Sequence, residues 1–69
     1  MTDTLGDALP REMARVRDEV VPSYIAIGRA GLPALTLMRA DLDLAAKAMI
    51  EGDIAEMVRV YQRLKDWHV

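Results

Sequence analysis

Side chains that could act in catalysis are few in this sequence, and no familiar motif groups them. The candidate nucleophiles are the hydroxyl groups of Ser23, Tyr24 and Tyr61. A general base would have to activate them, yet the one histidine, His68, is the penultimate residue. Asp41 and Asp43 resemble a carboxylate pair, but about 200° of helix would separate their side chains, so they could not face one substrate. The sequence therefore predicts a protein without catalytic residues that is not an enzyme.

Ligands for metals and cofactors are equally scarce. The chain has no cysteine and a single histidine, so a zinc site would have to be completed by carboxylates alone, an unlikely set for that metal. The spacing of acidic residues in a calcium-binding loop is also absent. We therefore expect no metal and no cofactor. Without disulfides or a structural metal, a chain of 69 residues is stabilised most readily by association with a second copy.

Composition indicates one small helical domain. The net charge is −2 and 52% of the residues are hydrophobic, mainly alanine, leucine, valine, methionine and isoleucine, which together favour helix over strand. No apolar run approaches the roughly 18 residues of a membrane span, and the N-terminal residues lack the pattern of a secretory signal. We expect a cytoplasmic protein that does not bind membranes. The sequence pI of about 5.2 argues against a nucleic-acid partner.

The first predicted helix covers residues 9–28. Residues 1–8 are polar and aperiodic, so we expect a flexible N-terminal tail followed by a single helical domain over residues 9–69. The helix is indicated by an apolar stripe with steps of three and four positions, namely Met13, Val16, Val20, Tyr24 and Ile27. Pro10 suits its first turn. Pro22 either kinks this helix, which the unbroken stripe favours, or breaks it into two.

The second predicted helix covers residues 32–51 and is apolar around most of its circumference. Such a wide apolar arc is typical of a central helix that is covered from more than one direction. Asp41 is the exception, because it falls inside the arc. It is either a buried carboxylate paired with an arginine, which another subunit could supply, or a residue that meets water in a gap between partner helices.

The third predicted helix covers residues 53–66. Gly52 suits the position just after a helix, Asp53 suits an N-cap, and Glu56 completes a capping-box-like pair with Asp53. So short a connection makes the second and third helices an antiparallel hairpin.

The segment 44–64 resembles one helical hairpin of the tetratricopeptide repeat family. The matching positions are Ala45, Gly52, Asp53 and Tyr61, and the departures from the family pattern are Ala48, Met57 and Leu64. The resemblance implies a pair of packed helices. No second copy of the pattern is present and such arrays need about three repeats, so a capped turn between two helices accounts for the likeness.

These signals predict an all-α protein of three helices, the first kinked and the last two forming a tight hairpin, that assembles as a homodimer. The candidate interface residues are Leu35, Leu37, Met38, Asp41, Leu44 and Trp67. An aromatic residue near a terminus is enriched at interfaces, so Trp67 either contacts a partner or folds back over the first helix.

The sequence has more apolar residues than a small core needs and no recognisable catalytic or ligand-binding residues. This combination predicts a non-enzymatic interaction module or regulator that acts as a homo-oligomer and binds another protein. The alternative is a DNA-associated transcriptional regulator, since the first helix, a turn at residues 28–31 and the second helix follow the order of a helix-turn-helix. The would-be recognition helix begins with residues 32–35, Leu-Pro-Ala-Leu, which cannot make bidentate contacts with base edges. This start and the acidic pI disfavour that alternative.

Overall fold

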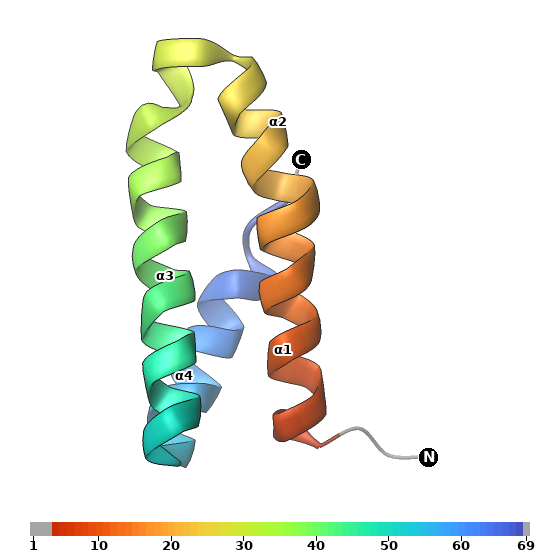
Figure 1. The fold of residues 1–69 in the computed structure, drawn as a ribbon, viewed down its shortest axis with the longest axis vertical. Coiled ribbons are helices and arrows are strands. Elements are labelled where there is room, and N and C mark those ends of the chain that lie inside the picture. The colour runs from red at the N-terminus through yellow and green to blue at the C-terminus, as the bar shows by residue number, and fades with distance from the viewer. Residues whose placement is uncertain (1–3, 69) are drawn as a thin grey trace.

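The computed structural model describes residues 4–68, and every regular element within them is helical. In chain order the elements are α1 (Leu5–Arg15), the π-helical turn η1 (Val16–Val20), α2 (Val21–Ala26), the 3-10 turn η2 (Gly28–Gly31), α3 (Leu32–Glu51) and α4 (Ile54–Lys65). The segments α1, η1 and α2 form one continuous arm that runs antiparallel to α3, and α4 packs against α1 and α3 (Figure 1). The predicted class, a compact all-α protein of three helices, is confirmed.

The N-terminal arm begins earlier than predicted, because α1 starts at Leu5. The Thr4 carbonyl accepts bonds from the backbone N–H groups of Asp7 and Ala8 at 3.0 and 2.8 Å. Leu9 is fully buried and Leu5 packs against the core, so burial in the next turn stabilises this start. Residues 5–8 are therefore helical and belong to the first helix, whereas residues 1–3 lie outside the described part of the chain.

Helical structure continues through Pro22 by way of the π turn η1. The N–H of Val21 donates to the carbonyl of Val16, five residues back, and this wider turn comes just before the position where proline lacks its own donor. The sequence left a kink and a break open. The structure shows a continuous arm, and the extra residue of the π turn is the local adjustment that accommodates Pro22.

The turn between α2 and α3 depends on two glycines. Gly28 has φ +71°, a left-handed conformation that follows a helix end readily only in glycine. Gly31 is buried, and a Cβ atom built on it would lie 2.2 Å from the carbonyl oxygen of Tyr24. The absence of a side chain therefore lets α2 and the start of α3 approach each other closely.

The turn between α3 and α4 satisfies the backbone at both helix ends. Gly52 has φ +67°, and the N–H groups of Gly52 and Asp53 donate to the carbonyls of Met49 and Ala48 at 3.3 and 3.0 Å, which is a Schellman motif. The Asp53 carboxylate accepts from the N–H of Glu56 at 3.1 Å. Half of the expected capping box forms, because the Asp53 N–H is engaged by Ala48 and the Glu56 carboxylate pairs with Arg59.

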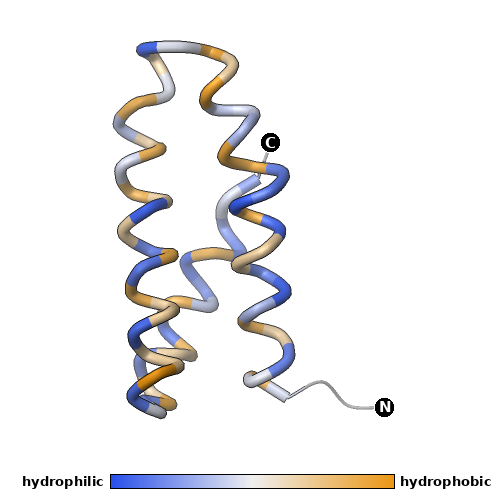
Figure 2. The backbone as a smooth tube through the Cα atoms, in the orientation of Figure 1, coloured by the Kyte–Doolittle hydropathy of each residue, from blue (hydrophilic) through white to orange (hydrophobic). Residues whose placement is uncertain are grey.

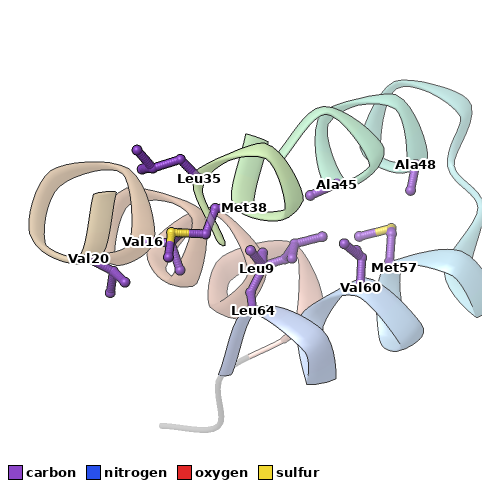
Figure 3. Close-up of a cluster of buried hydrophobic side chains, with 10 residues drawn as sticks. All are labelled: Leu9, Val16, Val20, Leu35, Met38, Ala45, Ala48, Met57, Val60 and Leu64. Carbon is purple, nitrogen blue, oxygen red and sulfur yellow. The ribbon is translucent and has the colours of Figure 1, made fainter. Parts of the chain in front are cut away.

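The core lies between the arm, α3 and α4. Apolar and polar stretches follow one another along the helices (Figure 2). The buried apolar side chains are Leu9, Val16, Val20, Leu35, Met38, Ala45, Ala48, Met57, Val60 and Leu64. They extend from Val20 and Leu35 at one end to Ala48 and Met57 at the other (Figure 3). This core positions one buried charge, Asp41, on its border.

Candidate functional site

Asp41 is a buried carboxylate with two partners from the C-terminal part of the same chain. It is 2% exposed and projects from the middle of α3. Its Oδ2 accepts a hydrogen bond from the indole Nε1 of Trp67 at 2.9 Å, and its Oδ1 lies 2.8 Å from Nη2 of Arg63 on α4. The hypothesis of a water-filled gap is therefore wrong. The hypothesis of a buried carboxylate paired with an arginine is confirmed, with the arginine supplied by this chain.

The two oxygens of Asp41 are not equally satisfied. Oδ2 has a hydrogen bond to Trp67, whereas Oδ1 is buried and receives no hydrogen bond from residues 4–68. The N–H groups of Arg63 do not point at Oδ1 with hydrogen-bond geometry, so their contact is an ion pair only. The Arg63 side chain is 50% exposed and covers a carboxylate oxygen that still has acceptor capacity.

Trp67 reaches Asp41 because the chain after α4 is held against the N-terminal arm. Nη2 of Arg15 donates to the carbonyl oxygens of Leu64 and Trp67 at 3.0 and 2.7 Å. The ring of Trp67 also meets the ring of Tyr24 edge to face, with centroids 6.3 Å apart and planes at 85°. Of the two positions considered for Trp67, the structure shows the folded-back one, against α2 and α3.

A shallow notch of about 250 Å³ opens beside this cluster. Its lining residues are Leu37, Asp41, Arg63, Asp66 and Trp67. Two carboxylates face one guanidinium, so the notch has a net charge of −1. Leu37 and Trp67 supply apolar walls. A second hollow of about 260 Å³ follows along the same side of α3 and is lined in part by Leu44.

The predicted interface residues divide into two groups. Leu35, Met38 and Asp41 are buried within the single chain, and of these three Asp41 also lines the notch. Leu37 and Leu44 are 52% and 36% exposed, and Trp67 is half-buried at the notch.

Three further residues complete the cluster, namely Arg15, Arg63 and Asp66. Sequence reasoning missed them because charged residues on an amphipathic helix ordinarily face solvent. One signal could have found Arg63. A buried aspartate needs a cation nearby, and in a short hairpin the neighbouring helix is the first place to look for one.

Within residues 4–68, no group of three or more histidine, cysteine or acidic side chains could hold a metal ion. No helix in that range combines the length and hydropathy that a bilayer span needs. The notch offers buried and exposed carboxylates, a guanidinium and an indole, which are groups that recognise a charged partner.

Comparisons with models of protein families, with curated proteins and with solved structures found no match to this chain.

Proposed function

We propose that this protein is a non-enzymatic helical interaction module that acts as a homodimer and docks through the side of α3 beside α4. One observation carries the proposal. Leu37 and Leu44 stay exposed on α3 although a buried core lies directly beneath them. They are seven positions apart and therefore share one face of the helix. Exposed aliphatic side chains grouped in this way mark interaction surfaces.

The distribution of exposed apolar side chains supports α3 as the docking element. The structure shows nine large apolar side chains exposed within residues 4–68, and five of them lie on α3. These five are Leu32, Leu37, Leu44, Met49 and Ile50. One side of α3 already contacts the N-terminal arm and α4, and of the five exposed residues Leu37 and Leu44 lie on the face that a second copy would cover.

A homodimer also fits the size of the chain. A stable interface buries about 800 Å² on each partner, roughly a sixth of the 4680 Å² that this chain exposes. A two-fold axis would place the Leu37 and Leu44 face of one copy against the same face of the other. The added burial supplies stability that a chain of 69 residues without cysteine cannot obtain from disulfides.

Sedimentation velocity at micromolar concentration tests the proposal. We expect a mass near twice 7.7 kDa, and the double variant Leu37→Glu/Leu44→Glu should sediment as a monomer with an unchanged circular dichroism spectrum. Ile50→Glu is the matched control, because Ile50 is 86% exposed on α3 and lies on another face. A wild-type monomer would refute the homodimer, and dissociation by Ile50→Glu alone would move the interface to the α3–α4 turn.

The DNA-binding alternative keeps the chain order of a helix-turn-helix, but the direction of its helices does not support it. A helix-turn-helix places its helices at about 90–120°, whereas α2 and α3 run side by side in opposite directions (Figure 1). A gel shift at low salt separates the two functions, because phosphate-driven binding would appear there and weaken as salt is added.

A further inference from the structure

We propose that the notch between α3 and the C-terminal turn binds an arginine side chain presented by a protein partner. This inference deepens the proposed interaction function, and the statement that the partner is a protein rests on that function. The notch itself can be tested without any partner.

The charges of the notch favour a cation. Asp41 and Asp66 contribute two carboxylates and Arg63 one guanidinium, so an arriving positive group would make the notch neutral. Asp66 is exposed, and its side chain forms no hydrogen bond or ion pair with residues 4–68. It is therefore available at the rim, where a charge-assisted bond to a guanidinium can form.

The buried oxygen of Asp41 is the second and independent observation. Oδ1 has no hydrogen bond, although the aspartate is 2% exposed. Arg63 covers this oxygen with an ion pair at 2.8 Å but does not direct an N–H at it. A guanidinium that displaces Arg63 towards solvent can donate to both Oδ1 and Asp66, because its donors form a planar fork.

The walls of the notch fit the remainder of an arginine side chain. Leu37 is half-exposed and offers a surface to the aliphatic stem, while the indole of Trp67 offers an aromatic contact to the guanidinium. A volume of about 250 Å³ accommodates one such side chain. Lysine fits less well, because an ammonium is a compact point charge without the planar fork.

The test uses the full chain and N-acetyl-L-arginine methylamide as the probe. Trp67 is the only tryptophan, so its fluorescence reports occupancy of the notch directly. At constant ionic strength we expect a saturable change with a Kd of about 1 mM in a titration to about 20 mM. The neutral citrulline analogue should give no saturable change, and the lysine analogue should bind at least about threefold more weakly.

Three variants sharpen the result. Asp66→Asn should raise the Kd about fivefold, whereas Asp43→Asn, the same change on the far side of α3, should leave it unchanged. Arg63→Gln removes the competing cation and should lower the Kd about threefold. The proposal would be overturned if the probe gave no saturable change, or if the citrulline or lysine analogue bound equally well. It would also be overturned if both asparagine variants weakened binding equally, or if Arg63→Gln abolished it.

The same probe identifies the source of the arginine, and its outcome is separable from that of the homodimer. If the probe binds and also dissociates the dimer in sedimentation, the arginine comes from the second copy. If the probe binds and the dimer persists, the notch receives a different protein. Either result supports arginine binding at the notch. A monomeric wild type that still binds the probe would refute only the homodimer.

Discussion

The N-terminal arm and α3 lie antiparallel, and the two halves of this pair differ in how other helices cover them. In the half that contains α4, three helices meet, and Leu9, Val60 and Leu64 are fully buried between them. In the half that contains α2, this helix packs on α3, and its Tyr24 ring meets the ring of Trp67. None of the six residues of α2 is buried, and Ile25 and Ile27 are more than half exposed.

This difference shows that apolar content and burial are separate properties of the sequence. Aliphatic residues occur in both halves, but α4 buries Met57, Val60 and Leu64 within one chain, whereas α2 buries none of its residues. Elements with few buried contacts open at low free energy, so we expect the α2 half to be the less stable one. The polar cluster of Asp41, Arg63 and Trp67 lies at the border, where it ties the end of α4 to both halves.

The largest expected effect comes from removing a core side chain of the α4 half. Leu64→Ala should lower the free energy of unfolding by about 2–5 kcal/mol, because a fully buried leucine leaves a cavity. Ile25→Ala in α2 should change it by less than about 0.5 kcal/mol. Urea denaturation followed by circular dichroism, at one protein concentration, measures both. Equal losses in the two variants would abolish the contrast between the halves.

The next effect tests the close approach of Gly31 to the carbonyl of Tyr24 in the α2 half. Gly31→Ala should lower the free energy of unfolding by about 1–3 kcal/mol, because the new Cβ atom would lie 2.2 Å from the carbonyl oxygen of Tyr24. Gly28→Ala is the control, since it has φ +71° and nothing within 4 Å of a Cβ atom, and should lose about 1 kcal/mol through backbone strain alone. A smaller loss for Gly31→Ala than for Gly28→Ala would mean that the turn relaxes freely.

Much of this fold follows from local sequence signals. Pro33, Gly52 and Asp53 mark the boundaries of α3 and α4, because each acts through the backbone of its own turn. The start of α1 was missed because Gly6 and the polar residues around it suggest a loop, while the burial of Leu9 that stabilises this turn depends on α4, far along the chain. The π turn before Pro22 is likewise a compromise between local strain and the packing of Val16 and Val20.

The site was predictable only in part. The position of Asp41 inside an apolar arc identified it as a residue that needs a partner, and the partner type, an arginine, follows from charge. That the cation is Arg63, and that Trp67 donates to the other oxygen, depends on the angle between α3 and α4 and on the Arg15 contacts with the carbonyls of Leu64 and Trp67. Contacts at such separation in sequence leave no periodic pattern.

A smaller effect distinguishes the ion pair at the border from an ion pair on the surface. Arg63→Ala should lower the free energy of unfolding by about 1–2 kcal/mol, because it leaves Asp41 buried without a cation, and the exposure of Arg63 keeps the loss below that of a fully buried pair. Arg59→Ala removes an exposed pair with Glu56 on the same helix and should lose at most about 0.5 kcal/mol. Salt should reduce the second effect more than the first. Equal losses would show that Asp41 does not depend on its cation.

The smallest effect concerns the exposed pair on η1, where Arg17 donates to Asp18 at 2.9 Å. This hydrogen bond holds the pKa of Asp18 below its ordinary value. A depressed pKa in the folded state adds stability above the pKa of the unfolded chain, and that stability is lost as the pH falls through the folded pKa. Arg17→Ala should therefore raise the pKa of Asp18 in an NMR titration of its carboxyl carbon. The urea midpoint at neutral pH should stay unchanged, because both side chains are solvated and adjacent residues can meet in the unfolded chain as well. A midpoint that fell as far as in Arg63→Ala would instead place the π turn among the elements on which the α4 half depends.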